Sequence, residues 1–133
     1  ENFNLLTNLL LKEDSLKISI IGSKEDRVRI GVQESDLLKN WCGSLSLRES
    51  AAMVSQSDFV INNSSLCMHL AGAFKVPSLT LLGDWYDSAK LHHKQWGYPE
   101  ITIIGKELKA SINHICSVPE AYETIKKSIQ KIH

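Results

Sequence analysis

The sequence has no excess of charge of either sign. Fifteen Lys and Arg residues balance fifteen Asp and Glu residues over 133 residues, so no net field attracts the chain to nucleic acid or to an anionic membrane. No run approaches the roughly 18 consecutive apolar residues that a bilayer-spanning helix needs. We therefore expect a globular protein that binds no nucleic acid and has no transmembrane segment.

Cysteine is also scarce. The three cysteines, Cys42, Cys67 and Cys116, are odd in number, far apart and outside any CxxC pair. This pattern argues against a disulfide framework and fits a reducing compartment. We expect buried or half-buried free thiols in a cytoplasmic protein.

Several common catalytic motifs are missing. The sequence contains no GxGxxG, GxxxxGK[ST], GxSxG or HExxH, so the interpretations as a dehydrogenase, P-loop NTPase, serine hydrolase or zinc protease lack their signatures. The adjacent His92 and His93 make a poor metal site, because neighbouring side chains diverge and no carboxylate is obviously positioned beside them. We expect neither a metal nor a cofactor.

The chain does contain helical patterns that alternate with short apolar runs. A capping box, Ser46 to Glu49, starts one helix, and Gly31 weakens another. The expected helices cover 2–12, 24–39, 46–56, 65–75 and 119–132, the expected strands cover 17–22, 58–62, 78–83 and 101–105, and 84–99 is an expected loop. This alternation indicates a doubly wound, Rossmann-like α/β fold with a parallel sheet in one domain, 1–133.

The first candidate site follows the second expected strand, because ligands of parallel sheets collect beyond the carboxyl ends of the strands. There, 62–65 reads Asn-Asn-Ser-Ser and leads into a helix that carries His69. Free amides, the helix dipole and two hydroxyls suit a phosphate or diphosphate. Alternatively, Asn and Ser are only the preferred helix caps, and His69 is a packed ring.

The second candidate is the expected loop. Residues 85–99 contain two Trp, two Tyr, two His and two Lys. The aromatic rings suit a nucleobase and the cations suit a phosphate. Alternatively, the rings only cover the end of the sheet.

Four elements in fixed order resemble a known family. They are a helix start with Gly43, Leu45, Ser46, Leu47 and Glu49, a strand at 58–61, a helix with Ser65, His69, Leu70, Ala71 and Ala73, and a strand at 77–83. This succession resembles the carboxy-terminal domain of family 9 glycosyltransferases, the bacterial lipopolysaccharide heptosyltransferases and their relatives.

The resemblance implies that residues 1–133 are the carboxy-terminal, nucleotide-sugar-binding half of a two-domain GT-B enzyme. The acceptor-binding domain, the catalytic base and the first strand of this domain are then expected upstream of Glu1, so the chain alone is expected to be inactive. The implied reaction moves heptose or a similar sugar from a nucleotide-activated donor, with an ADP-sugar favoured. The acceptor is a lipopolysaccharide or cell-surface glycan, the anomeric centre inverts, no metal takes part, and the full-length protein is peripheral at the inner membrane.

The resemblance also implies site residues. Those expected to face the donor diphosphate are Asn63, Ser64, Ser65 and His69. Those expected near the nucleoside or sugar are Ser23, Glu49, Gly83, Asp84, Trp85 and Tyr86.

Two departures from the family pattern concern the diphosphate site. Counting back from His69, the usual acidic residue falls on Ser64 and the usual glycine on Leu66. With one inserted residue, Asn63 instead stands in the acidic position. The missing carboxylate keeps open the alternative of a catalytically inactive binding or assembly module. A domain like that of a GT-B-type nucleotide-sugar epimerase is a further alternative.

Overall fold

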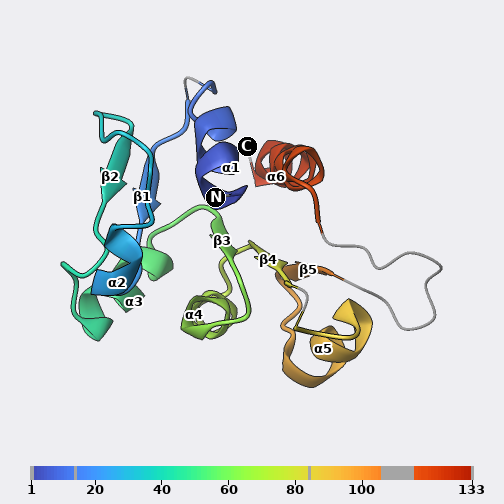
Figure 1. Ribbon diagram of the computed structural model, residues 1–133. Helices are drawn as coiled ribbons and strands as arrows, with labels where there is room; N and C mark the ends of the chain where they lie inside the picture. The colour runs from blue at the N-terminus through green and yellow to red at the C-terminus, as the bar shows by residue number, and fades with distance from the viewer. Residues whose placement is uncertain (1, 14, 84, 106–115, 133) are drawn as a thin grey trace. The chain divides into compact units, whose positions relative to one another are not determined.

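The structure is a computed structural model that describes residues 2–13, 15–83, 85–105 and 116–132, and Figure 1 labels its elements. The helices are α1 (Asn2–Leu10), α2 (Lys24–Arg27), α3 (Leu47–Ser55), α4 (Leu66–Phe74), α5 (Ala89–Trp96) and α6 (Val118–Ile132). The strands are β1 (Ile18–Ile20), β2 (Leu38–Asn40), β3 (Val60–Asn62), β4 (Ser78–Leu81) and β5 (Ile101–Ile104). None of these helices has the length and hydropathy needed to cross a bilayer.

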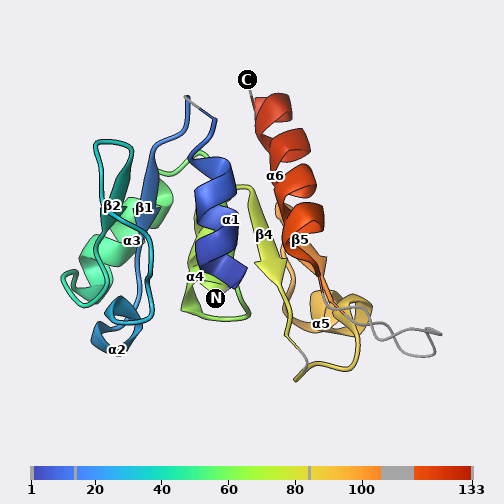
Figure 2. The same cartoon turned by 45° about the horizontal axis from the view of Figure 1, so that its top comes forward.

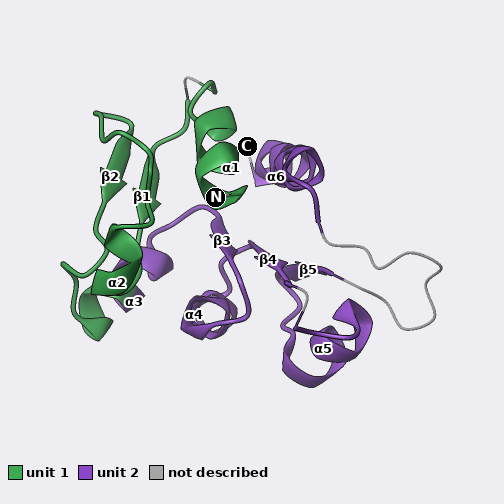
Figure 3. Ribbon diagram, viewed as in Figure 1, with its two compact units in different colours: residues 1–50 green, residues 51–133 purple. Residues whose placement is uncertain are grey.

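The chain forms two compact units, residues 1–50 and 51–133, which Figure 3 distinguishes by colour. In the first unit, β1 and β2 are parallel, with Ile18 opposite Leu38. Leu38 and Cys42 are buried there, as are Leu6 and Leu10 of α1.

The helix predicted over 24–39 is wrong. Only Lys24–Arg27 is helical, and Leu38–Asn40 is a strand. The Arg27 guanidinium donates to the carbonyls of Asn40 and Cys42 at 3.0 and 3.2 Å, which stabilises the returning strand instead of a longer helix. Pairing with β1 gives Leu38 a fully buried place that its weak helical pattern did not predict.

The second unit contains a parallel sheet in the order β3-β4-β5. Val60 lies opposite Ser78, and Ser78 lies opposite Ile101. The central strand β4 is buried at Ser78, Leu79 and Thr80, as expected for a parallel strand covered on both faces. Figure 1 shows α4 and α5 on one side of this sheet and α6 on the other.

Helix α6 covers its face of the sheet through one apolar stripe. Ala121 and Ile125 of this helix are buried, four positions apart and so on one face, and Figure 2 shows α6 alongside β5. The backbone N–H of Glu120 donates to the Ser117 hydroxyl at 3.3 Å, which caps the start of this helix.

The loop predicted over 84–99 contains a helix, α5, so that prediction is wrong. Ser88 caps it by accepting from the backbone N–H of Leu91 at 3.2 Å. Ala89 and His92, three positions apart, are the buried residues of this helix. The aromatic and histidine content of the segment had hidden an ordinary helical pattern without internal Gly or Pro.

The prediction of free thiols is confirmed. Cys42 is buried, and Cys67 and Cys116 are half-buried, each as a free cysteine.

Candidate functional site

The candidate site begins where β3 ends and α4 starts. Asn63 is exposed, while Ser64 and Ser65 are half-buried. Ser65 stands at the N-cap position in extended backbone, but its side chain makes no capping hydrogen bond. Burial raises the pKa of the neighbouring Cys67 thiol, and a hydrogen bond with Ser65 partly opposes that rise. Ser65 thus occupies the cap position of α4 without a capping hydrogen bond from its side chain.

Ser64 is joined to a residue of α5. Its Oγ lies 2.8 Å from Nε2 of His92, whose side chain is 6% exposed. The ring of Tyr86 meets the His92 ring edge-on, with 4.8 Å between centroids. Side chains from the end of β3 and from the segment after β4 thus both contact one histidine of α5.

The pKa of His92 lies below its ordinary value. Burial is the main cause, because it disfavours the charged ring, and the nearby His69 and His93 lower the pKa further by charge repulsion. The imidazole of His92 is therefore neutral at neutral pH.

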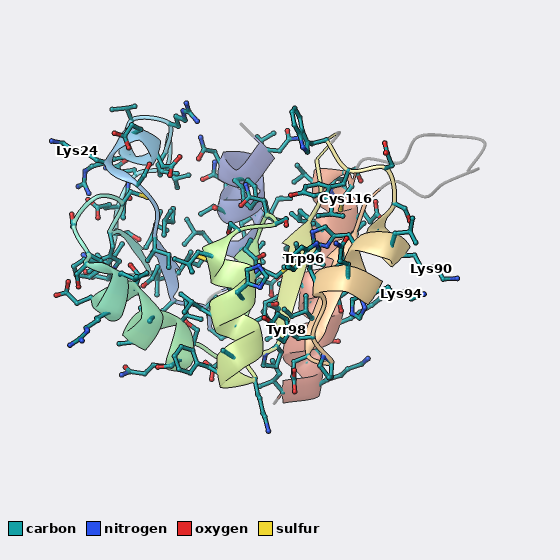
Figure 4. The ribbon with its side chains drawn as sticks, turned by 90° about the horizontal axis from the view of Figure 1, so that it is seen from below. Lys24, Lys90, Lys94, Trp96, Tyr98 and Cys116 are labelled. Carbon is teal, nitrogen blue, oxygen red and sulfur yellow. The ribbon has the colours of Figure 1, made fainter. Side chains whose placement is uncertain are left out.

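His69 lies in a cluster of aromatic rings. Its Nδ1 and the Tyr98 hydroxyl are joined by a hydrogen bond of 3.1 Å, and the Tyr98 and Trp96 rings meet the imidazole edge-on at 6.0 and 6.3 Å between centroids. Figure 4 shows Trp96 and Tyr98 on the side of α4 that faces α5. The ring is nevertheless only half-buried, so it is packed and still partly open to a ligand.

A buried polar pair lies at the end of β3. The Thr80 hydroxyl donates to Asn62 Oδ1 at 2.9 Å, and both residues are buried. The Asn62 Nδ2 group has no hydrogen-bond partner among the described residues. This pair orients the last residue of β3 just before the chain enters the polar segment.

The residues predicted near a nucleoside or sugar are only partly gathered. Tyr86 reaches the Ser64 cluster through His92. Trp85 is 91% exposed, and Gly83 is exposed with open space around it. Asp84 lies outside the described residues.

Ser23 and Glu49, the other two residues in that group, belong to the first unit and form helix caps. Ser23 makes a reciprocal capping box with Asp26. The Glu49 carboxylate accepts from the Ser46 backbone N–H at 2.7 Å, and the Glu49 N–H donates to the Ser46 hydroxyl at 3.3 Å. Hydrogen bonds from Ser46 hold the pKa of Glu49 below its ordinary value. The predicted capping box at Ser46 is confirmed.

A depression of about 540 Å³ lies over α5 and β5. Its lining contains Ala89, Lys90, Leu91, His93, Lys94 and Ile103. It includes none of the residues predicted to bind a diphosphate. Among the described residues, no group of three or more His, Cys, Asp or Glu side chains converges as metal ligands would.

The sequence placed His92 and Tyr98 in the second candidate segment, 85–99, but did not predict that they contact Ser64 and His69. The signal for His92 was its spacing of three from Ala89, which puts both on one helix face. The signal for Tyr98 was Gly72, three positions after His69 on the same face, since a helix glycine often marks a close approach.

Both the sequence and the fold of this chain are similar to those of known glycosyltransferases. The sequence model of glycosyltransferase family 9 (heptosyltransferase) matches residues 1–114, and no curated protein matches the chain. Among solved structures, the chain is similar to the E. coli ADP-heptose LPS heptosyltransferase II, with a TM-score of 0.76 at 16% identity. The match covers 98% of this chain and 41% of that one. The predicted α/β fold of the GT-B type is confirmed.

Proposed function

This chain belongs to glycosyltransferase family 9, and on that premise we propose that it is the carboxy-terminal, donor-binding domain of a glycosyltransferase. Its donor is a nucleotide-activated heptose or similar sugar, with an ADP-sugar favoured. Its acceptor is a lipopolysaccharide or another cell-surface glycan, bound mainly by a second domain. The full-length protein works on the cytoplasmic side of the inner membrane.

One observation carries this proposal. Two polar side chains at the start of α4 are hydrogen-bonded to residues of α5 and of the segment that follows α5. Ser64 is bonded to His92, and His69 is bonded to Tyr98. Both lie where β3 passes into α4, the end of a parallel strand at which such folds bind their ligands.

In the proposed reaction an acceptor hydroxyl attacks the anomeric carbon of the donor sugar. The bond from that carbon to the diphosphate oxygen breaks, its electron pair leaves with the diphosphate, and the anomeric configuration inverts. A base from the other domain removes the proton of the hydroxyl. The amides of α4, the Ser64 hydroxyl and His69 stabilise the charge that develops on the leaving diphosphate, without a metal. Asn63 and Ser65 flank the same anion.

The neutral residues before His69 are compatible with this role. Neither Ser64 nor Asn63 carries the negative charge that the family pattern has there. A neutral hydroxyl or amide adds no repulsion to a diphosphate at the positive end of a helix.

To test this, the full-length protein is titrated with ADP, UDP, GDP and the corresponding nucleotide sugars, and binding is monitored by calorimetry and by NMR. We expect ADP-linked ligands to perturb the signals of Ser64, Ser65 and His69. His69→Ala should lower turnover while the unfolding transition stays intact, and Ala73→Ser, exposed on the last turn of α4, serves as the matched control. Unchanged turnover in His69→Ala would refute the assigned role.

A non-catalytic binding or assembly module is the second candidate function, favoured by the absence of the usual carboxylate and glycine before His69. A product assay of the full-length protein with donor and acceptor separates the two. A binding module retains the donor but releases no nucleotide. Isomerisation of the donor without an acceptor would instead indicate an epimerase.

A further inference from the structure

His92 has an unusual combination of contacts for a buried histidine. Its Nε2 lies 2.8 Å from Ser64 Oγ, and its Nδ1 is buried without a hydrogen-bond partner among the described residues. Tyr86 packs edge-on against the ring. One nitrogen of this ring is therefore hydrogen-bonded to Ser64, and the other has no partner among the described residues.

This asymmetry selects one tautomer. The neutral imidazole carries a single N–H, on either nitrogen. A proton on Nδ1 would leave a buried N–H without an acceptor, and orphaned buried N–H groups are rarer than under-satisfied acceptors. A proton on Nε2 is instead donated to Ser64 Oγ, and only a lone pair is left unpaired on Nδ1. These contacts therefore favour the tautomer with the proton on Nε2.

The tautomer decides what Ser64 offers to a ligand. A hydroxyl has one hydrogen to donate and two lone pairs that accept. Because His92 donates to Ser64, the hydroxyl hydrogen of Ser64 stays available for another acceptor. The opposite tautomer would consume that hydrogen in the bond to His92.

We propose that His92 is a positioning residue that orients the Ser64 hydroxyl as a hydrogen-bond donor toward the donor diphosphate. His92 acts through Ser64 and does not itself touch the ligand. The inference rests on the proposed function of Ser64, and Tyr86 supports it by fixing the plane of the ring.

The first experiment requires no ligand. Long-range ¹H–¹⁵N NMR of the full-length protein at neutral pH reports which imidazole nitrogen of each histidine carries the proton, and comparison with His92→Gln assigns the His92 signals. We expect the Nε2–H tautomer. An Nδ1–H tautomer would overturn the proposal whatever the protein binds.

The second experiment measures binding of ADP to Ser64→Ala, His92→Phe and the double variant. His92→Phe retains a ring of similar size but donates nothing. We expect each single variant to weaken ADP binding by about tenfold, the value of one hydrogen bond to a charged group. We expect the double variant to bind no more weakly than either single variant, because His92 acts only through Ser64.

His92→Gln is the conservative variant, since the side-chain amide of glutamine can still donate a hydrogen bond to Ser64. It should retain most of the affinity, and if His92→Phe does not fold, the tautomer measured in the first experiment decides the proposal. If Ser64→Ala weakens binding while His92→Phe and His92→Gln bind normally, the positioning role is overturned and the role of Ser64 stands. If Ser64→Ala binds ADP normally, the assignment of Ser64 to the diphosphate is overturned, and the role of His92 with it.

Discussion

The ring of Tyr98 lies directly on Gly72. A β-carbon at residue 72 would come within 2.3 Å of that ring. The hydroxyl of the same tyrosine lies 3.1 Å from Nδ1 of His69, three positions earlier in α4. Tyr98, which follows α5, thus packs against α4 and also forms a hydrogen bond with His69 of that helix.

Gly72→Ala should therefore destabilise the protein by about 1–3 kcal/mol, the usual cost of adding a methyl group where no space exists. Chemical denaturation measures this loss. Gly83→Ala is the control, because nothing lies within 4 Å of a β-carbon at that residue. Equal stability of the two variants would show that the Tyr98 ring does not rest on Gly72.

Tyr98→Phe removes the hydroxyl and keeps the ring. We expect a loss of about 0.5–1.5 kcal/mol in unfolding free energy, the net value of an ordinary hydrogen bond, together with a changed ¹⁵N shift at His69 Nδ1. Tyr86→Phe also removes a phenol hydroxyl but leaves the His69 bond intact, so it is the matched control. An unaltered His69 spectrum in Tyr98→Phe would contradict the hydrogen bond.

Thr80→Val keeps the shape of a buried side chain and removes its donor. Asn62 Oδ1 then loses its bond from the Thr80 hydroxyl, and a buried polar atom left without a partner costs about 1–3 kcal/mol. Thr102→Val on the exposed side of β5 is the control, and we expect it to change stability little. Similar unfolding curves for both variants would argue against the Asn62–Thr80 bond.

Stability should fall in mild acid because of His92. Its pKa is lowered in the folded state by burial and by the nearby His69 and His93, so below about pH 6.5 the unfolded chain binds a proton that the folded chain does not. The contribution is complete above that pH and is lost as pH falls toward the folded pKa. Denaturation of the wild type and His92→Gln between pH 5 and 8 measures it. An identical pH slope for both proteins would contradict this assignment.

Cys116, labelled in Figure 4, should react slowly in the folded protein. Burial is the main cause that raises its pKa to about 11, and the nearby Glu120 adds to the rise. Because the thiolate is the reactive form, alkylation at pH 8 should be about a hundredfold slower than for an unperturbed thiol. Peptide mapping after brief iodoacetamide treatment, with denatured protein for reference, measures this.

The contribution of Glu120 is tested separately. Glu120→Gln should accelerate alkylation of Cys116, whereas Glu123→Gln, exposed on the same helix, should not. Equal rates in the two variants would remove Glu120 as a cause of the raised pKa.

Much of the fold was predictable from local pattern. The succession from β3 through α4 to β4, the capping box at Ser46 and the buried stripe of α6 each follow from residues close together in the chain. The two wrong predictions, at 24–39 and 84–99, concern segments of mixed polarity. In both, pairing or packing with distant residues decides the structure, as the burial of Leu38 and His92 shows.

Local sequence is sufficient to predict the alternation of helices and strands, the polar turn before α4 and the family, because periodicity, caps and spaced motifs are local properties. Only the tertiary structure shows which distant side chains form hydrogen bonds with the residues of that turn and of α4. Ser64 meets His92 across 28 positions, and His69 meets Tyr98 across 29. Such contacts depend on how α5 and the segment after it pack beside α4. The glycine at residue 72 signals a close approach, but only that packing shows that Tyr98 is the residue that makes it.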